Sequence, residues 1–214
     1  MKSLLIGVVL ILVVGLGGFA YRNAVEHPSR PIACPVDAKV CPDGTAVARV
    51  GTTCDFPACP APNVSLADAA IAFALPAGFA ATASPDAATV AAYAATVASL
   101  TAPSEIIIRR YLLDASSTAL AVIQETALGM ASGAPLPATA FTSTTLGTHR
   151  FTVAAIGRFE GVVDTAYYLS RGQDVLRFDA VDQGVANWTD PGLKVSGLPA
   201  NAALRVLLAT LQGD

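Results

Sequence analysis

The spacing of apolar and polar residues changes several times along this chain, first at the N-terminus. Residues 4–20 form an unbroken run of apolar residues and glycines, with Lys2 before it and Arg22 after it. A signal-peptide core is usually about 7–15 residues long, and a membrane-spanning helix about 17–25. We therefore expect residues 4–20 to be an uncleaved transmembrane helix. The alternative is a signal peptide cleaved near Ala20, which would release a secreted protein.

A period of two residues predicts several β-strands in the second part of the chain. Ile71, Phe73 and Leu75 alternate with alanines, and residues 105–113 are rich in β-branched and large apolar side chains. Further strands are expected at 150–159, 163–170 and 174–181. Residues 170–173 supply a hairpin turn between the last two strands.

Three other stretches have spacings typical of helices. Residues 84–86, Ser-Pro-Asp, match a helix start, and apolar residues follow at three- and four-residue intervals up to residue 100. A second helix is expected at 117–128. A third begins at Pro199 and carries a stripe of leucines.

These elements predict an α+β fold in which an antiparallel sheet has its helices packed on one face. The predicted organisation is a signal anchor or signal peptide at 1–22, a stalk at 23–33, a disulfide-rich module at 34–59, a proline-containing linker at 60–64 and an α+β domain at 65–214.

All four cysteines, Cys34, Cys41, Cys54 and Cys59, lie within 26 residues. Closely spaced cysteines in even number behind an export signal indicate disulfides formed in an oxidising compartment. A zinc site is the weaker alternative, because the cysteines are separated by six, twelve and four residues and no histidine lies among them. Of the three pairings available, we favour the crossed one, Cys34 with Cys54 and Cys41 with Cys59. A module this small depends on covalent closure for its stability.

Part of the module is similar to a known family through Cys34-Pro35, Val40-Cys41, Asp43-Gly44-Thr45 and Cys54. It resembles the core of Kazal-type serine protease inhibitors, which implies an inhibitory bond between Val36 and Asp37. The family's first and last cysteines have no counterpart here, and no tyrosine or asparagine follows the Asp-Gly-Thr. The alternative, which we favour, is a two-disulfide surface module without inhibitory activity.

A second resemblance covers residues 70–212. The segment "FALPAGF", a meander ending in "AYYLSRGQDVLRFDAVD" and a closing amphipathic helix follow one another as in the PsbP/Mog1-like fold group. The resemblance implies a non-catalytic assembly or binding module.

Charge and motifs narrow the functions further. The net charge is −3 and the 13 Lys and Arg residues form no basic cluster, so we expect no nucleic-acid partner. The two histidines, His27 and His149, are far apart, and no catalytic motif accompanies them. We expect no catalytic residue, cofactor or metal. The five carboxylates between residues 160 and 182 could converge on a cation, but we interpret them as surface groups.

Two further features bear on binding. Trp188, the only tryptophan, is a candidate partner contact, and the alternative is that it folds over the edge of the core. Arg109 and Arg110 are consecutive in a predicted strand, so they should lie on opposite faces, one of them paired with a carboxylate. The sequence therefore predicts a membrane-anchored or secreted envelope protein that binds an unknown envelope protein or ligand. A Kazal-like inhibitor and an extracytoplasmic enzyme are the alternatives.

Overall fold

The computed structural model describes residues 7, 11–19, 21–22, 34–41, 46–59, 61–95 and 103–213. The chain forms two compact units, residues 1–39 with 48–57 and residues 40–47 with 58–214. The predicted stalk at 23–33, the residues 42–45 of the Kazal-like pattern and Pro60 of the linker lie outside the described residues.

The described residues of the N-terminal apolar run, 7 and 11–19, are helical, as are residues 21–22, and all of them are exposed. Among the described residues, no helix has both the length and the apolar character needed to cross a membrane. Residues 4–6, 8–10 and 20 of the predicted transmembrane helix lie outside the described residues, so that helix is unconfirmed.

The cysteine module contains a small two-stranded sheet formed by β1 (Ala38–Val40) and β2 (Ala46–Ala48). Disulfides join Cys34 to Cys54 and Cys41 to Cys59, and there is no free cysteine. The crossed pairing is therefore confirmed. Two disulfides indicate an extracytoplasmic location.

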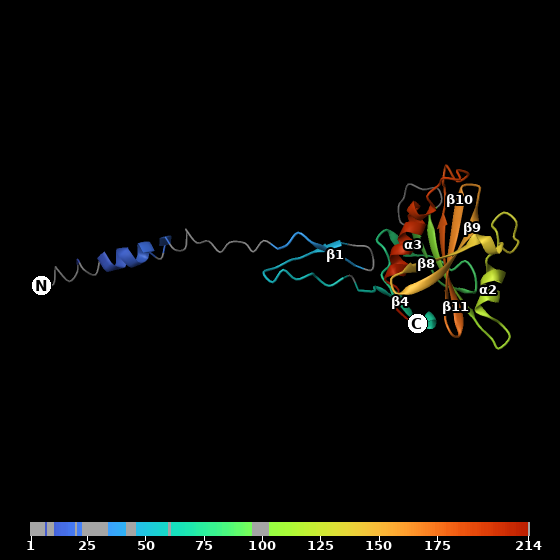
Figure 1. Ribbon diagram of the computed structural model, residues 1–214, viewed down its shortest axis with the longest axis horizontal. Coiled ribbons are helices and arrows are strands. Elements are labelled where there is room, and N and C mark those ends of the chain that lie inside the picture. Colours follow the sequence, from blue (N-terminus) through green and yellow to red (C-terminus); the bar gives the residue numbers. More distant parts are fainter. Residues whose placement is uncertain are drawn as a thin grey trace. The chain divides into compact units, whose positions relative to one another are not determined.

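The C-terminal domain is built on a seven-stranded sheet (Figure 1). Its strand order is β5-β6-β7-β11-β10-β9-β8, and every neighbouring pair is antiparallel. The strands are β5 (Phe79–Ala81), β6 (Thr89–Ala95), β7 (Glu105–Leu112), β8 (Phe141–Leu146), β9 (His149–Phe159), β10 (Val162–Ser170) and β11 (Asp174–Asp182). The large antiparallel sheet and the strands predicted around β7, β9, β10 and β11 are confirmed.

A smaller sheet pairs β3 (Val64–Leu66) with β4 (Ile71–Phe73), and the 3-10 turn η1 (Ala67–Ala69) joins them. Two more 3-10 turns, η2 (Ala138–Ala140) and η3 (Val195–Gly197), precede β8 and α3. The strand predicted at residues 71–75 is thus present but shorter.

Two helices cover the large sheet from opposite sides, α2 (Ala119–Thr126) and α3 (Pro199–Ala209) (Figure 1). On β10, Tyr167 and Leu169 lie in the core cluster that includes α3, while Ala166 and Tyr168 lie in the cluster that includes α2. The prediction of helices on one face is therefore wrong. Successive residues of a strand point to opposite faces, and most residues of β10 and β11 are buried on both faces, so both faces have a cover.

The face under α3 holds the larger core. Its fully buried side chains include Phe73, Phe151, Ile106, Ile108, Leu176, Phe178, Leu204, Leu207 and Leu208. Asp182 at the end of β11 accepts hydrogen bonds from the backbone N–H groups of Ala200 (2.6 Å) and Asn201 (3.1 Å), in the first turn of α3. Burial raises the pKa of Asp182, although these N–H groups act to lower it. The carboxylate thus caps the helix and fixes its start against the sheet.

The prediction of a helix from residue 84 to residue 100 is wrong, because residues 89–95 form the strand β6. Asp86 accepts hydrogen bonds from the Ala88 N–H (3.0 Å) and the Thr89 hydroxyl (2.8 Å), so the helix-start pattern belongs to a turn that leads into a strand. On β6, Ala92 and Tyr93 are both buried, because both faces of this strand are covered. Residues 96–100 of the predicted helix lie outside the described residues.

Candidate functional site

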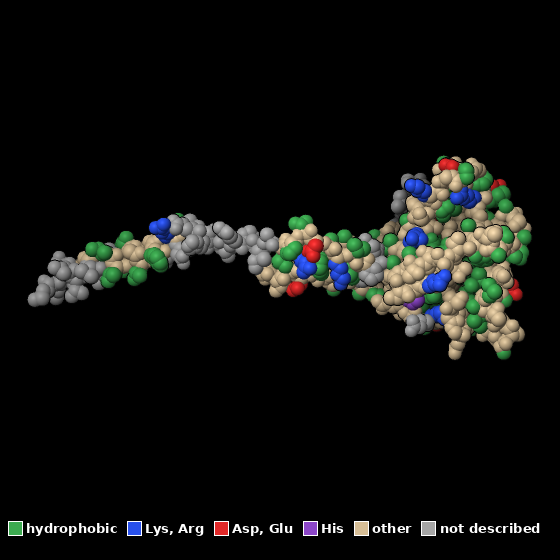
Figure 2. Space-filling view, viewed as in Figure 1, with side chains coloured by type: hydrophobic (Ala, Val, Ile, Leu, Met, Phe, Trp, Pro, Cys, Tyr) green, Lys and Arg blue, Asp and Glu red, His purple; other side chains and the backbone are tan. Residues whose placement is uncertain are grey.

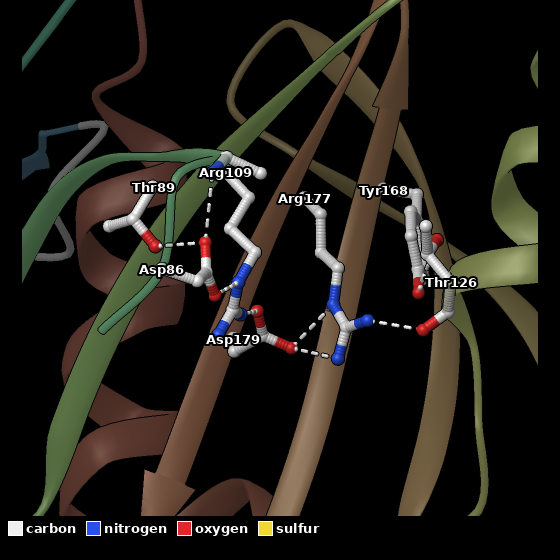
Figure 3. Close-up of polar contacts among 8 residues, drawn as sticks. Asp86, Thr89, Arg109, Thr126, Tyr168, Arg177 and Asp179 are labelled. Atoms are coloured by element: carbon white, nitrogen blue, oxygen red, sulfur yellow. Dashed lines mark hydrogen bonds and ion pairs between the residues drawn. The ribbon is translucent and has the colours of Figure 1, made fainter. Parts of the chain in front are cut away.

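A row of charged side chains runs from the turn before β6 across β7 and β11, on the sheet face that carries α2. We call Asp86, Arg109, Asp179 and Arg177 the charged ladder (Figure 3). Arg109 on β7 lies opposite Arg177 on β11, and Asp179 lies two residues farther along β11 on the same face. The turn before β6 supplies Asp86.

Each charge of the ladder contacts its neighbours directly. Arg109 Nε donates to Asp86 Oδ2 at 2.7 Å, and Arg109 Nη1 donates to Asp179 Oδ2. Arg177 Nε donates to Asp179 Oδ1 at 2.7 Å, and its Nη2 lies 2.6 Å from the same oxygen. Asp179 therefore lies between two guanidinium groups, as Figure 3 shows.

The end of α2 completes the ladder. Arg177 Nη1 donates to the backbone carbonyl of Thr126, and the Thr126 hydroxyl lies 3.4 Å from the Tyr168 hydroxyl. The Arg177 guanidinium also lies over the Tyr168 ring, 5.6 Å from its centre. The last carbonyls of a helix have no partner within the helix, so the contact with Thr126 stabilises the C-terminal end of α2.

Burial strengthens these contacts. The side chain of Asp179 is 1% exposed, and those of Arg109 and Arg177 are 16% and 11% exposed. Burial alone would lower the pKa of Arg177, but the charge of Asp179 outweighs it and the pKa lies above its ordinary value. For Tyr168 the effect of burial has the opposite sign, because it disfavours the ionised phenolate and raises the pKa to about 12. At neutral pH Arg177 is thus ionised, and Tyr168 keeps its proton.

Asp164 lies beside the ladder without joining it. It is on β10, opposite Val181, on the same face as Asp179. Its Oδ1 is the one buried side-chain oxygen or nitrogen without a hydrogen-bond partner among the described residues. Burial, and next the charge of Asp179, raise the pKa of Asp164 to about 7 against the opposing effect of the two arginines.

The opposite face carries a second, separate group of ion pairs. Arg110 Nε donates to Asp174 Oδ2 at 2.6 Å, and Arg171 contacts the same carboxylate through two nitrogens at 2.7 and 2.6 Å. Arg171 also donates to the carbonyl of Ala69 at 2.9 Å. Arg109 and Arg110 therefore lie on opposite faces as predicted, but both are paired.

The cysteine module holds the two residues of the predicted inhibitory bond, Val36 and Asp37. Val36 is fully exposed, and the neighbouring Asp37 forms two hydrogen bonds with Arg49, at 2.7 and 3.0 Å. The hydrogen bonds from Arg49 lower the pKa of Asp37. Arg49 in turn donates to the carbonyl of Cys54 at 2.9 Å, and its guanidinium lies 4.1 Å from the centre of the Phe56 ring. Arg49 thus fixes the residue that follows Val36.

The remaining predicted residues lie apart from the ladder. Trp188 is half-buried, and its backbone carbonyl accepts a hydrogen bond from Arg158 at 3.4 Å. His149 opens β9, and its Nε2 lies 3.1 Å from the carbonyl of Gly213. Asp164 and Asp179 lie on one face of the sheet, whereas Asp174 and Asp182 lie on the other. In the described part of the chain, no group of three or more His, Cys, Asp or Glu is placed to hold a metal ion.

The sequence singled out Arg109 as one of two consecutive arginines and Asp179 only as one of the five carboxylates between residues 160 and 182, and it did not pair the two. The signal was present in the two-residue period of the strands: residues 107, 109 and 111 share one face of β7, and residues 177 and 179 share one face of β11. What the sequence lacks is the register that places these two strands side by side.

Lys and Arg side chains are dispersed over the visible face of the C-terminal domain rather than gathered in a patch (Figure 2). The search against known families and curated proteins finds no match to the chain. A crystal structure from Bacteroides thetaiotaomicron VPI-5482 is weakly similar, with a TM-score of 0.42 and 12% identity over 68% of this chain and 46% of that chain. A likeness this weak carries no argument about fold or function, so the Kazal-like and PsbP-like resemblances stay predictions.

Proposed function

We propose that this protein is an extracytoplasmic, non-catalytic binding protein whose C-terminal domain recognises an envelope protein or ligand. In this proposal residues 4–20 tether the protein to the membrane, or direct its secretion if they are cleaved. The two disulfides support the compartment, since such bonds persist where the surroundings are oxidising.

The observation that carries the non-catalytic role is the closed pairing of the ladder. The side chains of the ladder form hydrogen bonds with one another and with neighbouring protein atoms, which involves Arg109, Asp179 and Arg177. A general acid, base or nucleophile has to reach a substrate atom, directly or through one water. The ladder instead joins β7, β11 and α2, which suits a rigid scaffold that presents its surface to a partner.

The test is affinity capture with the tagged full chain from cross-linked cells. We expect a partner in stoichiometric amount that Trp188→Ala loses and Leu112→Ala keeps. Trp188 is the predicted contact, and Leu112 is a control at 70% exposure at the end of β7. Circular dichroism of both variants checks the fold. Recovery of the same proteins with an unrelated tagged envelope protein would contradict the proposal.

A second candidate is inhibition of a serine protease through the bond between Val36 and Asp37. It is favoured by the full exposure of Val36 beside an aspartate held by Arg49, because a bound inhibitor loop must be both accessible and rigid. A valine before the inhibitory bond suits proteases with small apolar pockets, of the elastase type.

Exchange of that residue tests the inhibitor hypothesis. Val36→Lys should transfer inhibition to trypsin-like proteases, which select a basic side chain at this position. Val50→Lys places the same charge on an exposed valine of the same module and should not. If the wild type inhibits no elastase-like protease, or if such a protease simply cleaves after Val36, the inhibitor hypothesis is wrong.

A further inference from the structure

The surroundings of Asp164 suggest a role beyond packing. The residue opposite it on β9 is Gly157, at a β-bulge where the register of β9 and β10 shifts between Asp164 and Thr165. Bulges locally disrupt a ladder of hydrogen bonds and often redirect side chains. Here the bulge brings the half-buried Asp164, whose Oδ1 is buried, and a glycine together on the α2 side of the sheet.

The segment after α2 lies against this glycine. The Met130 N–H donates to the carbonyl of Ile156 at 3.1 Å, and a Cβ atom built on Gly157 would lie 3.1 Å from the Met130 Cβ. A larger residue at this position would force Met130 to move, so glycine favours the close approach. Residues 127–136 therefore form a cover on this part of the sheet, held by the Met130 hydrogen bond and by bonds within the segment, such as Leu136 N–H to the Ala127 carbonyl at 2.9 Å.

The charged groups around Asp164 donate no hydrogen bond to its buried Oδ1. The nearest cations, Arg177 and Arg109, have their donors directed to Asp179, Asp86 and the Thr126 carbonyl. The covering segment 127–136 contains no titratable residue. On the face of Asp164 itself, the charged groups of the neighbouring strands are Arg177 and Asp179 on β11 and Glu105 and Arg109 on β7. The other titratable or charged groups on the surrounding elements are Asp174 and Asp182 on β11, Arg110 on β7, His149, Arg150 and Arg158 on β9, Glu160 in the β9–β10 turn and Glu125 on α2.

We infer that Asp164 is a proton-sensitive residue that controls the cover formed by residues 127–136: the cover closes over the protonated carboxyl and opens when the proton is lost. The ionised form has a buried oxygen without a donor and faces the like charge of Asp179, so both desolvation and repulsion favour the open state. Opening returns the carboxylate to water. This inference is independent of the proposed function.

The size of the effect follows from proton linkage. The closed state holds its proton up to a pKa of about 7, whereas an exposed aspartate titrates at about 4. Between these values the closed state binds a proton that the open state has released, so closure weakens as the pH rises. From pH 6 to pH 8 the opening equilibrium should increase about tenfold.

Hydrogen exchange of the Met130 amide in the full chain measures this opening. After correction for intrinsic exchange, the wild-type amide should be about tenfold less protected at pH 8 than at pH 6. Asp164→Asn should abolish this difference, since an amide does not titrate in this range. Glu160→Gln removes a carboxylate from the same hairpin and should keep the wild-type difference.

Equal protection of wild-type Met130 at both pH values would overturn the inference, as would a pH difference that persists in Asp164→Asn or vanishes in Glu160→Gln. Carbon-13 titration of the wild-type Asp164 carboxyl gives a second reading that needs no variant. A midpoint near neutrality is expected. A midpoint below about 5, close to that of an exposed aspartate, overturns the inference even if Asp164→Asn fails to fold.

Discussion

Asp179→Asn should be among the most destabilising polar substitutions in the C-terminal domain. Asparagine keeps the size of the side chain but removes the charge between Arg109 and Arg177. Both arginines would then be left with a buried positive charge and too few partners, at side-chain exposures of 16% and 11%. Removing one partner of a buried ion pair costs about 3–5 kcal/mol, and the amide oxygen still accepts one hydrogen bond, so we expect about 3 kcal/mol.

Urea unfolding at pH 6, followed by the fluorescence of Trp188, provides the measurement. Trp188 is the only tryptophan, so the signal reports on the C-terminal domain. Loss of the charge of Asp179 would relieve its repulsion of an ionised Asp164 and so offset part of the destabilisation. At pH 6 Asp164 is mostly protonated, so this offset is small. A loss of about 3 kcal/mol corresponds to a thermal midpoint lower by about 6–12 °C for a domain of this size.

Asp86→Asn is the matched control, because it removes the other carboxylate that contacts Arg109. Its side chain is 42% exposed, so solvent screens the pair and the expected loss is about 0–1 kcal/mol. Burial would raise the pKa of Asp86, but the hydrogen bonds from Arg109 and Thr89 outweigh it and lower the pKa. If Asp179→Asn lowers the free energy of unfolding no more than Asp86→Asn does, the buried ion pairs of the ladder do not stabilise the domain.

Three further predictions concern other parts of the chain. Asp182→Ala leaves two buried N–H groups of α3 without an acceptor and should lower the free energy of unfolding by about 1–3 kcal/mol in the urea assay, with Asp190→Ala as an exposed control. Reduction of the disulfides should unfold residues 34–59 and leave the thermal midpoint of residues 63–214 unchanged, whereas a fall of more than about 5 °C would show that the module stabilises the domain. Mass spectrometry of the mature protein should find residues before Tyr21 if residues 4–20 are an uncleaved anchor, and a chain beginning at Tyr21 would identify a signal peptide.

The sequence predicted the elements whose pattern is strong and local. The hairpin of β10 and β11 could be predicted because Tyr167 and Leu169 alternate on one arm, Leu176 and Phe178 on the other, and a turn joins the arms. The terminal helix could be predicted from its leucine stripe. The crossed disulfides were a preference among three pairings, which spacing alone could not decide.

Elements with small or polar side chains could not be predicted in the same way. In β6 the alanines conceal the two-residue period and favour a helix by propensity, but pairing with β7 makes the segment a strand. β8 reads FTSTTL and has no apolar alternation to mark it. The charged ladder depends on which strands are neighbours, and β7 and β11 are separated by more than sixty residues. Such a register is decided by the whole fold rather than by local sequence.

The long separation of β7 and β11 along the sequence also affects the order in which the domain folds. The strands β8 to β11 form hairpins between sequence neighbours, so their contacts close short loops, whereas the β7–β11 pairing closes a long one. Arg109 and Asp179 are 70 residues apart and meet only when that pairing forms. We expect the ladder to be absent from the folding transition state, so that substitutions in it accelerate unfolding and leave the refolding rate almost unchanged. The ladder would then govern how long the domain survives once folded.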